Sequence, residues 1–165
     1  MPAVYLANGL GFTTLAAPAI TGIVQRLEKE GFSIFEPFFA SKDLGVEIAR
    51  LQQFEKNLDL LKEKLAIINS EIGKRNALAI EESSVVVAVL DGGLDLDSGV
   101  AAEIGYASGK GKPIVGLRTD FRLAGDNFGS VVNLQVEYFI TRNGGMILPD
   151  VDSLVQFLKR LLPSK

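Results

Sequence analysis

An uninterrupted apolar run at Val85–Leu90 constrains the fold of this chain more than any other feature. The run consists mostly of valine and contains no polar residue. β-Branched side chains favour strands, and a strand without polar positions is buried on both faces, as in the middle of a parallel sheet. We therefore predict that Val85–Leu90 is a central strand of a parallel sheet.

Strand and helix patterns alternate along the rest of the chain. The other predicted strands are residues 3–7, 32–38, 113–117 and 136–140. The predicted helices are residues 20–27, 43–82, 98–109 and 151–162. Such alternation is typical of an α/β fold with a parallel sheet. With no internal repeat and no linker-like segment, the chain is expected to form one domain, residues 1–165.

Glycine and aspartate residues mark the predicted helix ends. Gly31 follows the first helix, where glycine commonly ends helices, and Asp150 or Asp152 is expected to cap the last one. Gly73 lies within the long helical stretch 43–82 and is the expected break in it. We therefore predict that this stretch forms two consecutive helices.

The composition excludes several kinds of catalytic site. The chain contains no histidine and no cysteine, which rules out a Ser-His-Asp triad, a thiol nucleophile, an iron–sulfur cluster and almost any structural zinc site. Catalysis would have to use carboxylates, hydroxyls, amines, guanidinium groups or a bound cofactor. The lack of cysteine also suits a reducing compartment, so we expect a cytoplasmic protein.

Charge and hydropathy argue against nucleic-acid and membrane partners. The formal net charge is -3, and nucleic-acid-binding domains are typically basic. The apolar stretch before the first charged side chain, Arg26, is interrupted by polar residues, glycine and proline, and no basic residue precedes it. We therefore expect neither a secretory signal nor a membrane span.

Two loops follow predicted strands at the edge of the sheet where ligands bind in such folds. The first, Asn8–Thr14, partly matches the glycine-rich fingerprint of dinucleotide-binding sites, but Thr14 replaces the third glycine. A partial match of this kind is weak evidence for a cofactor. We interpret the segment as a tight strand-to-helix turn.

The second loop is rich in carboxylates. Asp91, Asp95 and Asp97 precede the predicted helix, and Glu103 lies inside it among small and apolar residues. Helix capping alone would explain Asp97. Glu103 would either face solvent or lie in a pocket. A carboxylate that is ionised, oriented and partly desolvated is suited to nucleophilic attack on a sugar C1′.

The segment from Asp97 to Ala107 resembles the signature of the nucleoside 2-deoxyribosyltransferase family. It contains the pattern Asp-x-Gly-x-x-x-Glu-x-Gly-x-Ala. Weaker similarities to the family occur in the same order along the chain. They cover residues 4–7, 35–38, 85–90, 119–122 and 133–135.

The resemblance implies a flavodoxin-like, Rossmann-like doubly wound sheet of about five parallel strands flanked by helices. It implies that Glu103 attacks C1′ of a 2′-deoxynucleoside and forms a covalent deoxyribosyl-enzyme, without metal or organic cofactor. Asp97 matches the aspartate that meets the nucleobase, and Tyr5 matches a tyrosine that orients the nucleophile. Asn133 matches an asparagine supplied by the neighbouring subunit, so a homo-oligomer with shared active sites is implied.

The chain departs from the family at several positions. Ser84 aligns with a catalytic aspartate, whose role could pass to Asp91. Asn8 and Gly9 replace a Gly-Pro pair, and residues 44–66 resemble an insertion. We expect the long helix between residues 43 and 71 to form an oligomer interface. The expected substrate contacts are Asn8, Gly9, Ser84, Asp91, Gly99 and Asn133.

Three functions remain open on these residues. Transfer of the deoxyribosyl group from one nucleobase to another is favoured, with nucleosides and free bases as the small-molecule partners. Related enzymes that cleave 5′-monophosphates carry serine at the position of Asp97, so a carboxylate here favours unphosphorylated nucleosides. The alternatives are a nucleoside or nucleotide N-glycoside hydrolase, and a non-catalytic nucleotide-sensing module on the same fold. The preference between purines and pyrimidines stays open.

Overall fold

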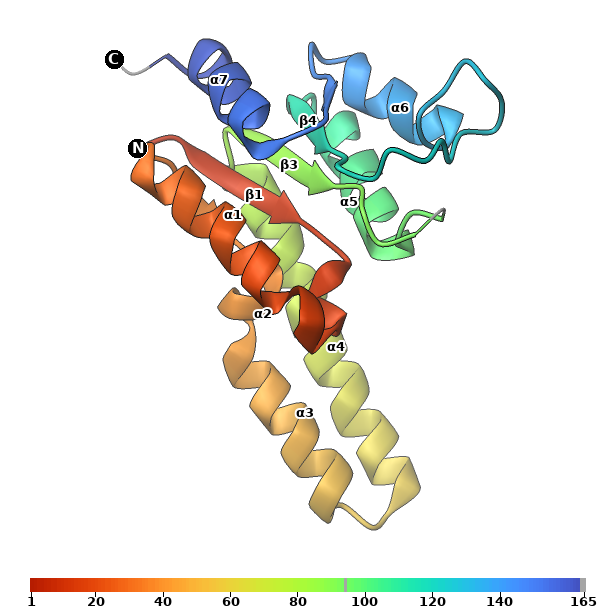
Figure 1. The fold of residues 1–165 in the computed structure, drawn as a ribbon. Coiled ribbons are helices and arrows are strands. Elements are labelled where there is room, and N and C mark those ends of the chain that lie inside the picture. Colours follow the sequence, from red (N-terminus) through yellow and green to blue (C-terminus); the bar gives the residue numbers. More distant parts are fainter. Residues whose placement is uncertain (94, 164–165) are drawn as a thin grey trace.

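The computed structural model describes residues 1–93 and 95–163. Its strands are β1 (Ala3–Ala7), β2 (Ser33–Phe35), β3 (Val85–Val89), β4 (Ile114–Leu117) and β5 (Ile147–Leu148). Its α-helices are α1 (Ala17–Lys29), α2 (Pro37–Ala40), α3 (Lys42–Phe54), α4 (Leu58–Glu82), α5 (Ser98–Gly109), α6 (Leu134–Thr141) and α7 (Val151–Leu161), and two 3-10 turns, η1 (Leu10–Phe12) and η2 (Thr14–Ala16), follow β1. The strands form one parallel sheet in the order β2-β1-β3-β4-β5 (Figure 1). The predicted α/β fold is confirmed.

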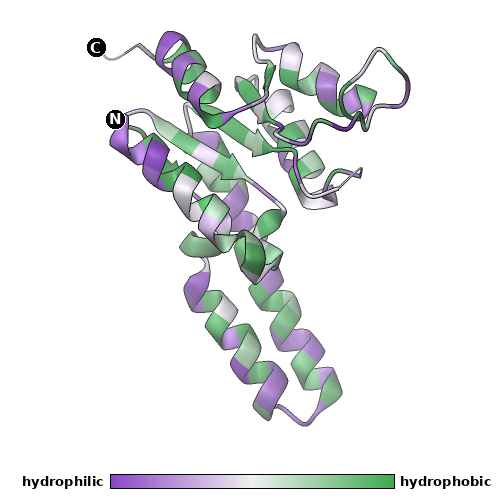
Figure 2. Cartoon of the chain, in the orientation of Figure 1, coloured by the Kyte–Doolittle hydropathy of each residue, from purple (hydrophilic) through white to green (hydrophobic). Residues whose placement is uncertain are grey.

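β3 is the central strand, as its sequence predicts. It pairs with β1 on one side and with β4 on the other. Each of its five residues is buried, because helices cover both faces of the sheet. Hydrophobic residues accordingly form the strands at the centre of the molecule (Figure 2).

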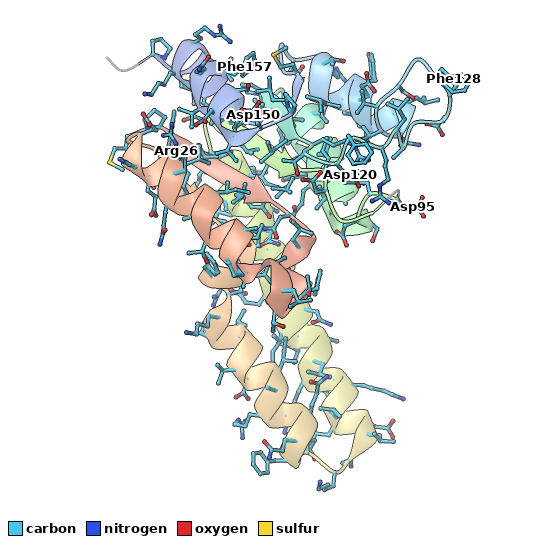
Figure 3. The ribbon with its side chains drawn as sticks, viewed as in Figure 1. Arg26, Asp95, Asp120, Phe128, Asp150 and Phe157 are labelled. Carbon is cyan, nitrogen blue, oxygen red and sulfur yellow. The ribbon has the colours of Figure 1, made fainter. Side chains whose placement is uncertain are left out.

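Two apolar layers lie on opposite faces of the sheet. On one face, α1 and α7 pack through Leu27 and Leu158 onto side chains that include Val87. On the other face, α4, α5 and α6 pack onto the alternate side chains of the same strands. An ion pair between Arg26 of α1 and Asp152 of α7, 3.2 Å apart, links the two helices of the first layer near Asp150, the residue that caps α7 (Figure 3).

The prediction of a fifth strand at residues 136–140 was wrong. These residues belong to α6, and the fifth strand is β5, which has two residues. Val136 and Ile140 are buried one turn apart on α6, and Asn133 caps this helix by accepting hydrogen bonds from two backbone N–H groups. Over five residues, an apolar pattern cannot distinguish a strand from a buried helix.

The second predicted strand is also shorter than expected. β2 covers only Ser33–Phe35, and Pro37 begins α2 instead of interrupting a strand. Proline suits the first turn of a helix because the missing N–H has no helical partner there. The side chain of Glu36 caps this helix by accepting a hydrogen bond from the N–H of Phe39 at 2.7 Å.

The long helical stretch breaks at residues 55–57 and not at Gly73. Asn57 caps α4 through hydrogen bonds to the N–H groups of Asp59 and Leu60. Gly73 stays helical, and a side chain there would meet nothing within 4 Å. The α3–α4 hairpin that results extends away from the sheet (Figure 1), and it contains the whole segment interpreted as an insertion, residues 44–66.

Candidate active site

A cavity of about 760 Å³ opens beyond the carboxyl ends of β1 and β3. The chain places β2 on one side of β1 and β3 on the other, so the order of the strands reverses here, which is where ligands bind in doubly wound sheets. The walls come from the loop after β1, from α2 and α3, from α4, and from the start of α5. Glu103 and Asp97 both line it.

Glu103 is held in a defined orientation. Its Oε1 atom accepts a hydrogen bond from the hydroxyl of Tyr5 at 2.6 Å and from Nδ2 of Asn76 at 3.4 Å. Among the described residues, its second oxygen, Oε2, has no hydrogen-bond donor. One carboxylate oxygen is therefore anchored while the other can react.

Burial raises the pKa of Glu103 above its ordinary value, and the negative charge of Asp97 adds to this increase. The hydrogen bonds from Tyr5 and Asn76 act in the opposite direction, because they stabilise the ionised carboxylate. A carboxylate with few water contacts and two protein donors is more basic than an exposed one and yet can be charged. This balance suits a nucleophile.

Tyr5 is fully buried on β1, and its ring stacks on Phe35 with the ring centroids 5.5 Å apart. Burial, together with the adjacent Glu103 carboxylate, raises the pKa of the Tyr5 hydroxyl well above its usual range. Tyr5 therefore keeps its proton and remains a hydrogen-bond donor to Glu103 at any physiological pH. The ring stacking and the burial restrict where that donor can point.

Asp97 occupies the position immediately before α5. Its Oδ1 accepts a hydrogen bond from the N–H of Val100 at 3.0 Å, which caps the helix, and the structure thus confirms this part of the prediction. Gly9 lies so close that a Cβ atom there would be 2.6 Å from Cβ of Asp97. Gly9 therefore lets the loop after β1 approach Asp97, and Gly99, one turn ahead of Glu103, lines the same cavity.

A buried polar group supports the loop after β1. Asn8 donates a hydrogen bond from Nδ2 to Glu36 at 2.7 Å and accepts one from the N–H of Gly11 at 3.0 Å. Both Asn8 and Glu36 are almost completely buried. A side chain at Gly11 would overlap the ring of Phe38. Asn8 thus connects the cavity wall formed by the loop to the wall formed by α2.

The structure brings together Tyr5, Asn8, Gly9, Asp97, Gly99 and Glu103, whereas Asp91, Asn133 and Ser84 lie elsewhere. Asp91 binds the N–H and hydroxyl of Thr119 and the N–H of Asp120, and so connects the loops after β3 and β4 at the edge that Figure 3 marks with Asp95 and Asp120. Asn133 caps α6 and lines a separate polar cavity of about 260 Å³.

Ser84 is at the opposite end of the sheet. It precedes β3, where its N–H donates to the carbonyl of Ala3 at the start of β1. The five residues of β3 span about 17 Å. The expectation that Ser84 contacts substrate is therefore corrected, since it is about one strand length away from the cavity.

Sequence reasoning missed Asn76, the second hydrogen-bond donor to Glu103. Its own Oδ1 atom is buried and has no partner in the described part of the chain. Asn76 interrupts a regular apolar stripe along α4, with Ile68, Ile72 and Ile80 at four-residue spacing. A polar side chain in such a stripe is the signal that would have indicated it.

The described residues contain no group of three or more carboxylates that could hold a metal ion. No helix in residues 1–93 and 95–163 is both long enough and apolar enough to cross a membrane.

The sequence profile of the nucleoside 2-deoxyribosyltransferase family matches residues 4–135, which include the whole cavity. The chain belongs to this family. A comparison with curated protein sequences finds no match.

Solved structures show the same fold. A conserved protein from Enterococcus faecalis is 23% identical, with a TM-score of 0.66 over 98% of this chain and 99% of the other. A 2-deoxyribosyltransferase from Leishmania mexicana is 18% identical, with a TM-score of 0.65 over 97% and 98%. A CMP N-glycosidase from Clostridium botulinum is 19% identical, with a TM-score of 0.53 over 95% and 98%.

Proposed function

We propose that this family member exchanges the nucleobase of 2′-deoxynucleosides through a covalent intermediate on Glu103. The observation that supports this most directly is the Glu103 carboxylate, anchored through Oε1 by Tyr5 and Asn76 within the cavity at the strand ends. Membership in the family supports nucleoside chemistry at this site. The histidine-free composition is compatible with a carboxylate mechanism.

In the proposed first step, Glu103 Oε2 attacks C1′ of the deoxyribose. A C–O bond forms, the bond from C1′ to the base nitrogen breaks, and its electron pair leaves with the base. Asp97 would relay a proton from solvent to the departing base, which neutralises the base. An incoming base then attacks C1′ from the opposite side, releases the Glu103 carboxylate and returns its own proton. Two inversions give net retention.

We further propose that the substrate is unphosphorylated and that the enzyme is a cytoplasmic homo-oligomer. The carboxylate of Asp97 in the cavity would repel a phosphate dianion. Asn133 lies outside the cavity of its own chain, which is compatible with a contribution to a neighbouring subunit's site. Oligomerisation would also cover the exposed apolar side chains of the α3–α4 hairpin.

A hydrolase is the second candidate, and the CMP N-glycosidase with the same fold favours it. The chemistry on Glu103 would be shared, with water replacing the second base. The two functions differ only in which nucleophile reaches C1′ in the second step.

The test is a base-exchange assay with a 2′-deoxynucleoside and a different free base. Glu103→Ala is the variant, and Glu82→Ala, at an exposed position on the same molecule, is its control. Wild type and Glu82→Ala should form the new deoxynucleoside, and Glu103→Ala should lose activity by at least about a thousandfold. Release of free base without exchange would assign a hydrolase. Ligand binding without turnover would contradict both enzymes and favour the sensing module.

A further inference from the structure

The start of α3 contributes two polar side chains to the cavity that the mechanism above does not use. Ser41 and Lys42 both line it. Ser41 is 7% exposed, and its hydroxyl oxygen has no hydrogen-bond partner among the described residues. None of the ion pairs in residues 1–93 and 95–163 involves Lys42.

An ion pair fixes the start of α3 beside the part of α4 that holds the nucleophile. Asp43, the next residue of α3, binds Arg75 of α4 with 3.1 Å between Oδ1 and Nη1. Arg75 is followed by Asn76, which donates to Glu103. The first turn of α3 therefore lies level with the part of α4 that contacts the carboxylate, across the cavity from it.

Apart from Asn69, the rest of this wall is apolar. Phe38, Ile48 and Ile72 line the cavity around the start of α3. A nucleobase has two flat apolar faces and a polar edge, so apolar side chains suit its faces and the isolated polar groups suit its edge. Asp97 and Glu103 line the same cavity, where C1′ of the sugar and its bond to the base would lie.

The hydrogen-bonding chemistry of a lysine determines which edge of a nucleobase it can bind. An ammonium group donates hydrogen bonds and cannot accept one. It binds adjacent acceptors such as O6 and N7 of an oxopurine, and it is mismatched to the amino group that adenine presents there. The Ser41 hydroxyl can donate to a second acceptor.

We propose that Ser41 and Lys42 read the edge of the nucleobase and select bases with a carbonyl oxygen over bases with an amino group at the same position. This inference rests on the proposed nucleoside function and adds the substrate class. It assigns the preferred substrates as 2′-deoxynucleosides of oxo bases, for example 2′-deoxyinosine over 2′-deoxyadenosine.

The kinetic test compares kcat/KM for 2′-deoxyinosine and 2′-deoxyadenosine in wild type, Lys42→Met and Ser41→Ala. Lys62→Met, an exposed lysine of α4 outside the cavity, is the control. The two glycosidic bonds differ in intrinsic lability, so the ratio of the two constants is compared between variants. Lys42→Met should lower the ratio of kcat/KM for 2′-deoxyinosine to kcat/KM for 2′-deoxyadenosine about tenfold or more. Ser41→Ala should lower this ratio less, and Lys62→Met should leave it unchanged.

A binding test separates this inference from the proposed activity. Hypoxanthine and adenine are titrated calorimetrically into Glu103→Gln, with and without Lys42→Met. Tighter binding of hypoxanthine that depends on Lys42 supports the inference even if no base exchange is found. Equal affinities, absence of binding, or an unchanged kinetic ratio would overturn it. So would an effect of Lys42→Met confined to 5′-monophosphate donors, because Lys42 would then bind a phosphate.

Discussion

The two ends of α4 lie in contrasting surroundings. Near its carboxyl end, Ile80 packs against the sheet, and Asn76 helps to hold Glu103 beside the fully buried Tyr5. Near its amino end, α4 packs against α3, and large apolar side chains stay exposed, including Leu58 and Ile67. The cavity lies where the buried end meets the exposed hairpin.

This difference shows that apolar periodicity and burial are separate properties in this chain. Helical spacing of apolar residues continues along α3 and α4, but only Leu51 and Ile80 of these two helices are buried. The central strands β3 and β4 bury all of their residues within one chain. The hairpin has apolar residues on its surface, so its stability within one chain depends less on apolar residues than the stability of the sheet does.

The largest effect is expected on the free energy of unfolding, when isoleucine is replaced by alanine once in each region. Ile20→Ala, at a residue that is 2% exposed on α1, should lower the free energy of unfolding by about 2–5 kcal/mol, because it leaves a cavity in the core. Ile67→Ala, at 65% exposure on α4, should change it by less than about 0.5 kcal/mol. Urea denaturation measures both.

Measuring how much Ile67→Ala lowers the free energy of unfolding at several protein concentrations sharpens this comparison. A cost that grows with concentration would show that Ile67 is buried between copies of the chain. Equal costs for Ile20→Ala and Ile67→Ala at every concentration would contradict the contrast between the two regions.

A smaller effect is expected from Tyr5→Phe, which disturbs only the buried site. It removes the hydrogen bond to Glu103, and kcat/KM should fall about tenfold to a hundredfold. This bond lowers the pKa of Glu103, so its loss should move the acid limb of the pH profile to higher pH. Tyr106→Phe removes a similar bond, to Glu81 on the surface, and should leave the profile unchanged. An unshifted acid limb in Tyr5→Phe would contradict this role.

The smallest effect concerns stability. Glu103 has a raised pKa in the folded chain, so folding favours its protonated form. Its contribution is fully present below the unfolded pKa of about 4.3 and is lost as pH rises through the folded value. Glu103→Gln should therefore be more stable than wild type at pH 7, and the gain should disappear near pH 4. Thermal denaturation across this range tests it, and a gain that persists at pH 4 would argue against ionisation as the cause.

The sequence predicts the sheet and much of the site, for local reasons. The run before Asp91 can only be buried, and the segment from Asp97 to Ala107 contains both the helix cap and the carboxylate. The break in the apolar stripe of α4 marks Asn76, but its contact with Glu103 could not be predicted, because that contact depends on how α4 packs near the strand ends. The error at residues 136–140 arose because five apolar-rich residues fit both the helical and the strand period. The error at Ser84 arose because the family resemblance was followed although Ser84 precedes the predicted strand, at the end opposite to the one where ligands bind.

The unequal lengths of the strands affect how copies of this chain can meet. The edge strands β2 and β5 have three and two residues, so they offer a neighbouring chain few unpaired N–H and C=O groups. Short edges of this kind protect proteins from uncontrolled strand-to-strand aggregation. Association between copies would then proceed through side chains rather than backbone ladders, and the α3–α4 hairpin presents apolar side chains for it. The central strands, which hold the reactive end of the sheet, stay outside any such exchange.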